Sequence, residues 1–205
     1  MPGIDYRVDL SPLSKIGNAL QAAGKQIPLV MTRAINHTGL KARTAMRRVL
    51  VKQTGLKART INRAVKSTKS FNGSAFVIRS AGGNIRLKFF NARETRKGVT
   101  AAPWNERRLY PGTFIKGGVF PNRKDLGMGG QVFERTSRSR FPIKGKKSGL
   151  YIANEMVSGA SHDAFYSVVN ADLAPRIEHE LYRVLGWLDR PSGTSRGSDL
   201  RAAAG

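Results

Sequence analysis

Cysteine is absent from this sequence of 205 residues. Disulfide bonds, thiolate nucleophiles and thiolate metal ligands are therefore excluded, and the composition is typical of a reducing compartment. No apolar run approaches the roughly 20 residues that a helix needs to span a bilayer. The first residues also lack the apolar segment of a signal peptide. We therefore expect a protein that is made and kept in the cytoplasm.

Acidic residues are scarce, and none occurs between Asp9 and Glu94. Lysine and arginine number 36 against 13 aspartates and glutamates, which gives a net charge of +23. Such an imbalance makes an isolated chain repel itself. It favours strongly negative partners, namely nucleic acid, an anionic membrane or an acidic protein surface. Aromatic residues are also few, at 8%, which suits one modest core with a flexible surface.

The longest regular pattern predicts a helix over residues 27–53, about 40 Å long, as the spine of the fold. Small or apolar residues recur there at gaps of four and three, which places them on one helical stripe. The stripe consists of Met31, Ile35, Thr38, Ala42, Ala45 and Val49. Pro28 fits the first turn, where its missing amide hydrogen is not needed. A shorter helix is expected before it, capped by Ser11 and ended by Gly24.

The heptapeptide TGLKART occurs twice, at residues 38–44 and 54–60. The first copy lies inside the predicted long helix, where Gly39 costs about 1 kcal/mol relative to alanine. In the second copy, Gly55 predicts a break that is followed by a short helix over residues 56–65. Two copies are too few for a solenoid. We interpret the repeat as a local duplication or a coincidence.

Beyond residue 71 the spacing of apolar residues changes from a helical period to an alternation of apolar and polar residues. Residues 75–80 and 85–90 predict a β-hairpin, because alternating segments flank a turn that contains two glycines. The polar segment 91–108 has no steady period and is expected to be a mobile or partner-ordered loop. Exposed basic loops are expected between further strands, which are predicted at residues 112–119, 131–135 and 150–156.

The C-terminal part predicts a helix over residues 161–188, in which Pro175 either introduces a kink or starts a second helix. Residues 189–205 are expected to be a disordered tail. The predicted fold class is α+β. Long N-terminal helices (11–65) and the C-terminal helix would pack on an antiparallel β-sheet with long basic loops (74–157). Residues 1–188 would form a single domain.

Five short motifs, in their order and spacing, resemble the minor tail protein Z family of long-tailed bacteriophages and prophages, and the broader tail-completion group. The motifs are PLVMTRAIN at residues 28–36, GTFI at 112–115, VFERT at 132–136, RFPI at 140–143 and DLAPRIEHEL at 172–181. The resemblance spans most of the chain between residues 28 and 188. The TGLKART repeat and the loop 117–130 have no counterpart in the family pattern.

The resemblance implies a structural virion protein that completes the tail and helps join it to the head. It implies a homo-oligomeric, hexameric ring around the DNA channel, assembled in the host cytoplasm and located in the tail or neck of the virion. The partners would be other phage tail, terminator or neck proteins. No contact with a membrane would be expected. The basic surface would meet either genomic DNA, through non-specific phosphate contacts, or acidic faces of neighbouring rings. No cofactor, metal or catalytic residue is implied.

Two basic clusters are candidates for contact with DNA or an acidic partner. The first belongs to the helical part and contains Arg43, Arg47, Arg48, Lys52, Lys57, Arg59 and Arg63. The second lies on a predicted loop and contains Arg138, Arg140, Lys144, Lys146 and Lys147. Either cluster could instead be a solvated basic face without a ligand. Aromatic residues are enriched at interfaces, so the candidates for a subunit interface are Trp104, Tyr110, Phe114 and Phe120. The first three could instead stack on bases, as in proteins that bind single-stranded nucleic acid.

A rival hypothesis is a helix-turn-helix DNA-binding protein that uses residues 50–65. Gly55 would form the turn. The residues that would face a DNA groove are Lys57, Arg59, Thr60 and Arg63. The predicted preceding helix is far longer than such a motif requires. This hypothesis therefore needs structural context.

An enzyme is the third hypothesis, and the sequence does not favour it. The histidines His37, His162 and His179 are scattered along the chain. A catalytic or metal site needs several groups that converge on one point. No such set of residues is evident from spacing, so we expect neither catalysis nor a metal site.

Overall fold

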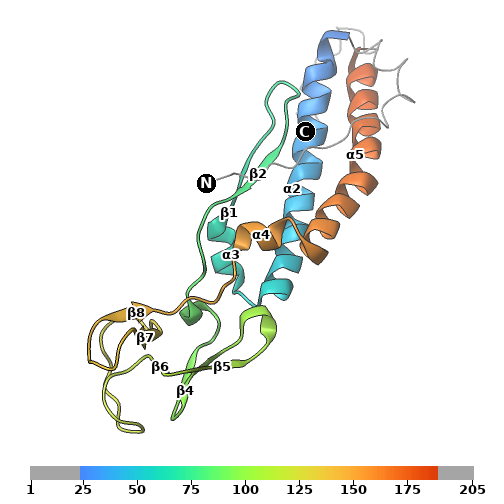
Figure 1. Cartoon of the computed structure of the whole chain (residues 1–205). Helices are drawn as coiled ribbons and strands as arrows, with labels where there is room; N and C mark the ends of the chain where they lie inside the picture. Colours follow the sequence, from blue (N-terminus) through green and yellow to red (C-terminus); the bar gives the residue numbers. More distant parts are fainter. Residues whose placement is uncertain (1–23, 189–205) are drawn as a thin grey trace, which may run out of the picture.

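Two long helices and a strand-rich end make up the structure, a computed structural model that describes residues 24–188. The helices are α2 (Ile27–Thr54) and α5 (Gly159–Leu188), which lie side by side and run in opposite directions (Figure 1). The molecule is therefore elongated, and the predicted α+β class is confirmed. The helix expected to begin at Ser11 and the tail at 189–205 lie outside the described residues.

Helix α2 begins and ends where the sequence predicts. Pro28 lies in its first turn, which is preceded by the short 3-10 helix η2 (Gly24–Gln26). At the other end Gly55 adopts a left-handed conformation with φ of 73°. Its amide donates a hydrogen bond to the Val51 carbonyl, which satisfies an acceptor of the last turn.

The buried face of α2 follows the predicted stripe only as far as Ala42. Beyond that point Met46 and Leu50 are buried, whereas Ala45 and Val49 are only half-buried. A repeat of 3.5 residues drifts around a straight helix of 3.6 residues per turn. Over several turns the buried face therefore moves on by one residue.

The two TGLKART copies adopt different structures. The first lies within α2, where Gly39 contacts the ring of Phe76; a Cβ atom there would overlap three ring carbons, the farthest at 2.8 Å. The second copy spans the end of α2 and the start of α3 (Ala58–Ala64). The predicted break after Thr54 is thus confirmed. The same seven residues occur both within a helix and across a helix end.

Helix α5 is continuous over 30 residues and contains Pro175 within it. A separate helix starting at Pro175 is therefore excluded. The buried residues of α5 recur at gaps of three and four: Phe165, Val169, Leu173, Ile177, Leu181 and Val184. They share one hydrophobic core with the buried face of α2.

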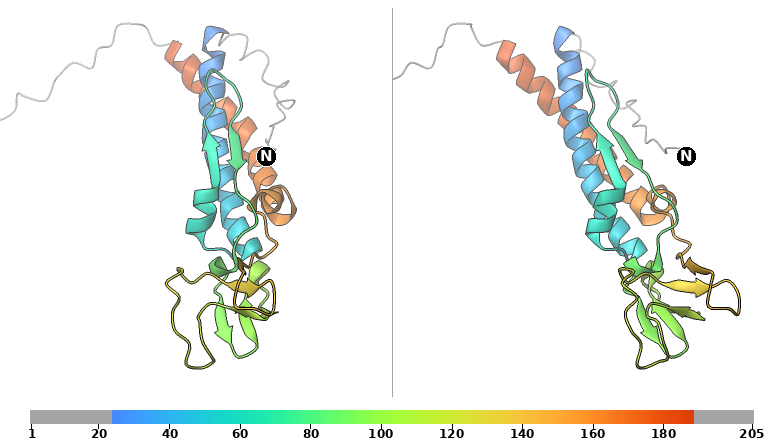
Figure 2. Two further views of the ribbon diagram at one scale, coloured as in Figure 1. Left: turned by 60° about the vertical axis from the view of Figure 1, so that its left-hand side comes forward. Right: turned by 90° about the vertical axis from the view of Figure 1, so that its left-hand side faces the viewer.

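The predicted hairpin between residues 75–80 and 85–90 is wrong. Strand β2 (Val77–Ser80) pairs antiparallel with β1 (Val65–Thr68), which directly follows α3. The β1–β2 ribbon lies alongside α2 (Figure 2). Of β1, only Val65 lies within the helix predicted over residues 56–65, and no strand was predicted at residues 66–68.

Residues 85–90 contain a 3-10 helix, η3 (Leu87–Phe89), in place of a strand. The backbone of Ile85 bonds to a late segment of the chain. Its N–H donates to the Leu150 carbonyl at 2.9 Å, and its carbonyl accepts from the Ser148 N–H at 2.8 Å. The preceding glycines therefore belong to a connection between separate parts of the fold.

Residues 91–108 are ordered, so the expected loop is also wrong. A three-stranded antiparallel sheet in the order β3-β4-β5 covers most of this segment. Its strands are β3 (Arg93–Thr95), β4 (Gly98–Ala101) and β5 (Arg108–Pro111), with the 3-10 helix η4 (Pro103–Asn105) before the last. Strands this short contain too few residues for a recognisable alternation.

A second three-stranded sheet has the order β6-β7-β8. Its strands are β6 (Thr113–Phe114), β7 (Phe133–Arg135) and β8 (Ile143–Gly145). Strands β6 and β7 lie within two predicted segments, but the third predicted strand, 150–156, is the helix α4 (Ile152–Met156). A short apolar run fits either a strand or a buried helix. Both three-stranded sheets lie at the end of the molecule where α2 ends (Figure 2).

Candidate anion-binding surfaces

The first predicted basic cluster contains two arginines that act within the fold. Arg43 donates a hydrogen bond to Ser67 Oγ at 2.6 Å, and Arg47 donates to the Val65 carbonyl. Burial lowers the pKa of Arg47, and the nearby charge of Arg43 lowers it further. Both side chains therefore hold strand β1 against α2, and they are less available to a partner than we expected.

The remaining residues of this cluster are exposed: Arg48, Lys52, Lys57, Arg59 and Arg63. Arg59 and Arg63 lie one turn apart on α3, so they share a face of this helix. Ile61, between them in the sequence, is fully buried and anchors the opposite face of α3. The fold therefore presents a short basic face on α3 to solvent.

The second predicted cluster lies at the strand-rich end of the molecule. Four of its members are exposed: Arg138, Arg140, Lys144 and Lys147. The fifth, Lys146, forms an ion pair with Glu134 of strand β7. This cluster therefore keeps most of its charge on the surface, although Lys146 also stabilises the β6-β7-β8 sheet.

A third basic group was missed by sequence reasoning. Five cations line an open cavity of about 230 Å³ where the two three-stranded sheets meet: Arg96, Lys97, Lys116, Arg123 and Arg135. The sequence contains a weak signal for it, because cations precede glycines in RKG at residues 96–98 and in KGG at 116–118. The cavity itself depends on contacts between distant segments, so no local pattern could predict it.

Three of the four aromatic candidates are half-buried within the fold. Trp104 donates its indole N–H to the Glu155 carboxylate at 2.9 Å. Phe114 packs against another ring on strand β7, with centroids 6.1 Å apart, and burial raises the pKa of the Tyr110 hydroxyl. Phe120 is exposed and is the aromatic candidate most accessible to another subunit.

Two carboxylates of α5 connect it to α2, and Asp172 is the first. Asp172 accepts hydrogen bonds from Thr38 Oγ1 at 2.8 Å and from Lys41, and it lies 3.5 Å from His37 Nδ1. Thr38 and Lys41 are the first and fourth residues of the earlier TGLKART copy. That copy therefore supplies the donors that fix α5.

Protonation of Asp172 is expected to weaken the contact between α2 and α5. Burial raises the pKa of its carboxyl, but hydrogen bonds from Lys41 and Thr38 and nearby positive charge outweigh burial, so the pKa lies below its ordinary value of 3.8. Such a group stabilises the fold above its unfolded pKa, and this stabilisation is lost as the pH falls through the folded pKa.

We therefore expect the free energy of unfolding, measured in urea, to decrease as the pH falls below about 4. Asp172→Asn should lower stability at pH 7 by about 1 kcal/mol and reduce that pH dependence. Asp163→Asn is a matched control, because Asp163 is exposed on the same helix. The same pH dependence in wild type and Asp172→Asn would contradict the assigned role.

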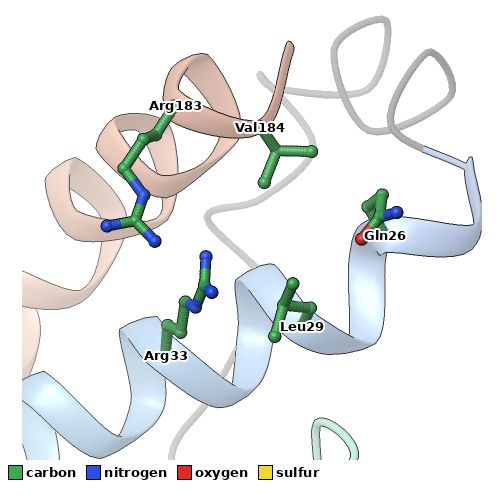
Figure 3. A pocket seen from close by; sticks show the side chains of 5 residues that line it. All are labelled: Gln26, Leu29, Arg33, Arg183 and Val184. Carbon is green, nitrogen blue, oxygen red and sulfur yellow. The ribbon is translucent and has the colours of Figure 1, made fainter. Parts of the chain in front are cut away.

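Glu180 is the second connecting carboxylate and lies among three arginines. It accepts a hydrogen bond from Arg176 at 2.7 Å, and its other oxygen lies 3.5 Å from Arg183 Nε and 4.0 Å from Arg33. Arg33 and Arg183 point toward one another across a cavity of about 430 Å³ that Gln26 also lines (Figure 3). Because Glu180 compensates these arginines, this cavity is less basic than the one at the strand-rich end.

No family model, curated protein or solved structure matches the chain. Among residues 24–188, no group of three or more histidine or acidic side chains is placed to hold a metal ion. Of the helices that the structure describes, none is long and apolar enough to cross a bilayer.

Proposed function

We propose that this chain is a structural virion protein of a long-tailed bacteriophage or prophage, which completes the tail and helps join it to the head. It would act as a homo-oligomeric ring around the DNA channel, with six subunits to match the symmetry of the tail. The proposal rests on the five motifs that resemble the minor tail protein Z family and on their arrangement in the fold.

The two longest motifs meet across the helix pair. PLVMTRAIN, at residues 28–36, forms the first turns of α2, and DLAPRIEHEL, at residues 172–181, extends from the middle of α5 into its second half. Both contribute residues to the core. Arg33 of the first motif lies 4.0 Å from Glu180 of the second. Two segments that are far apart in the sequence therefore form one interhelical contact.

The three remaining motifs form one sheet, and this observation carries the proposal. GTFI contains β6, VFERT contains β7, and RFPI ends at the first residue of β8. Thr113 pairs with Glu134, and Arg135 pairs with Ile143. Each match is short and unspecific when taken alone. Their combination into two contiguous structural units is what a shared fold would require.

The charge distribution also supports a protein with anionic neighbours. The carboxylates of Glu94, Glu134, Asp172 and Glu180 are each paired within the fold. These carboxylates are therefore not available to compensate the exposed lysines and arginines, whose charge remains on the surface. In a ring around DNA, the basic face of α3 and the loop cluster would meet phosphates or the acidic face of an adjacent ring.

Deletion of the gene for this chain from the phage or prophage genome that carries it tests the proposal. We expect electron micrographs to show DNA-filled heads separate from tails, together with a loss of infectious particles. Wild-type chain supplied in trans should restore both. Mass spectrometry of purified wild-type particles should detect the chain. Normal, infectious, tailed particles from the deletion would overturn the proposal.

The competing hypothesis is a helix-turn-helix DNA-binding protein built on residues 50–65. Lys57, Arg59 and Arg63 are exposed, as that hypothesis requires. Its second helix, α3, has only 7 residues and is followed at once by strand β1. Gel shifts with several unrelated duplexes distinguish the two hypotheses. Equal binding that weakens steeply with salt favours phosphate contact, whereas sequence-selective binding at moderate salt favours the competing hypothesis.

A further inference from the structure

The basic cavity at the strand-rich end is formed by segments from both three-stranded sheets. Arg96 and Lys97 belong to the turn between β3 and β4, and Lys116 follows β6. Arg123 comes from the long loop before β7, and Arg135 is the last residue of β7. Five cations from distant parts of the sequence thus line one open cavity of about 230 Å³.

Positive charge in this cavity is compensated only in part. Glu94 forms an ion pair with Arg123, and both side chains are mostly buried, at 11% and 16% exposure. The Glu94 carboxylate also accepts the backbone N–H of Lys116 at 3.3 Å, which fixes the segment that carries this lysine. The side chains of Arg96, Lys97 and Lys116 remain exposed. None of the described residues that line the cavity is acidic.

Arg123 lines the cavity but is held by the fold. Its guanidinium is paired with Glu94, and its Nε atom is buried. Arg123 therefore helps to form the wall, and the exposed cations are the groups that an anion can contact.

Two glycines set the shape of the cavity through close backbone packing. A Cβ atom on Gly98, whose φ is 146°, would overlap the Tyr110 carbonyl oxygen, and a Cβ atom on Gly117 would lie 2.8 Å from Leu126 Cδ2. The approach at Gly98 is to a backbone oxygen at positive φ and requires glycine, whereas a Cβ atom on Gly117 would require a shift of the flexible Leu126 side chain. The cavity therefore owes part of its shape to backbone packing, in addition to its long basic side chains.

We propose that this cavity binds a phosphate-class anion through Arg96, Lys97, Lys116 and Arg135. Guanidinium and ammonium groups form charge-assisted hydrogen bonds with multiply charged oxyanions. The cavity is smaller than the roughly 300–1,000 Å³ of pockets that hold drug-sized ligands. It therefore fits a phosphate or diphosphate group better than a whole nucleotide. This inference does not depend on the tail-completion role, and either can fail without the other.

Isothermal titration of the full chain with inorganic pyrophosphate, at constant ionic strength, tests the site. We expect saturable binding of one pyrophosphate per chain, weakened at least about tenfold in Arg96→Ala/Lys116→Ala. The matched control is Lys25→Ala/Lys69→Ala, which removes the same charge from exposed positions that do not line the cavity and should leave the affinity unchanged. Equal weakening in both variants, no weakening in either, or an absence of saturable binding would overturn the proposal.

A second measurement avoids any effect of the substitutions on folding. Pyrophosphate should protect Lys97 and Lys116 of the wild-type chain from acetylation, as measured by mass spectrometry. Lys25, which is exposed and does not line the cavity, should react at the same rate with and without pyrophosphate. Uniform protection of all three lysines, or none, would overturn the proposal. Polyglutamate that protects Lys97 and Lys116 as well as pyrophosphate does would also overturn the assignment to phosphate.

The source of the phosphate group is distinguished by repeating the protection experiment with random-sequence duplex DNA. Selective protection of Lys97 and Lys116 by the duplex supports a site for backbone phosphates. Protection by pyrophosphate but not by the duplex supports a site for a free phosphate compound. Either result, with the control lysine unprotected, supports an anion site in this cavity.

Discussion

Replacement of Glu180 by alanine should lower the free energy of unfolding by about 3 kcal/mol, because breaking a buried ion pair leaves charge without compensation. The Glu180 side chain is only 2% exposed, and Arg33, Arg176 and Arg183 surround it. Without the carboxylate, three guanidinium groups would face one another at the contact between α2 and α5. The arginines are partly exposed, so we place the effect at the lower end of the range for buried pairs.

Urea denaturation followed by circular dichroism measures this effect. Glu178→Ala is the matched control, since Glu178 is exposed on the same helix and its loss should change stability by less than about 0.5 kcal/mol. Glu180→Gln should fall between the two, because glutamine keeps the hydrogen bond to Arg176 but not the charge. If Glu180→Ala and Glu178→Ala were equally stable, the compensating role of Glu180 would be wrong.

Gly39→Ala is expected to destabilise the fold by about 2 kcal/mol, the usual cost of overpacking a core. Alanine is normally preferred over glycine within a helix by about 1 kcal/mol, so propensity alone predicts the opposite sign. The added Cβ atom would overlap the ring of Phe76, which is only 4% exposed and packs directly on Gly39. Steric overlap should outweigh the gain in helix propensity.

Gly186→Ala provides the matched control on the other long helix. A Cβ atom on Gly186 has no neighbour within 4 Å, so this substitution should stabilise the protein by about 0.5 kcal/mol. Combining Gly39→Ala with Phe76→Leu should cost less than the sum of the two single changes, because leucine leaves room for the new methyl group. Strict additivity in this double-mutant cycle would show that Phe76 is not the cause.

The long helices were predictable because their signals are local. The period of α2, Pro28 in its first turn and Gly55 just after its end all lie within the segment that forms the helix. Many residues contribute to the same helical period, so one atypical residue does not change the prediction. Only the drift of the buried face from Ala45 to Met46 required the structure, because it accumulates slowly along the helix.

The strand-rich end was predicted poorly because its strands are short and their partners lie elsewhere. Strand β2 pairs with β1 rather than with residues 85–90, and residues 91–108 form an ordered sheet. A strand of three or four residues has little alternation of its own, and its stability comes from packing against its neighbours. The helix α4 (Ile152–Met156) was mistaken for a strand because a short apolar run fits either element.

The basic clusters show how far composition could be used. The excess of positive charge and the exposed position of Lys57, Arg59 and Arg63 followed from sequence. That Arg43 and Arg47 instead hold β1 to α2 did not, since their acceptors lie on a separate element. A charged side chain looks the same in a sequence whether its partner is solvent, the protein's own backbone or another molecule.

The sequence by itself determined the net charge, the two long helices and the positions where α2 begins and ends, because these properties depend on composition and on neighbours within a few turns. Only the tertiary structure decided which cations remain exposed, which strands pair, and that five basic residues from separate segments line one cavity. These features depend on distances between residues remote in the chain, and such distances are set by the packing of the whole fold.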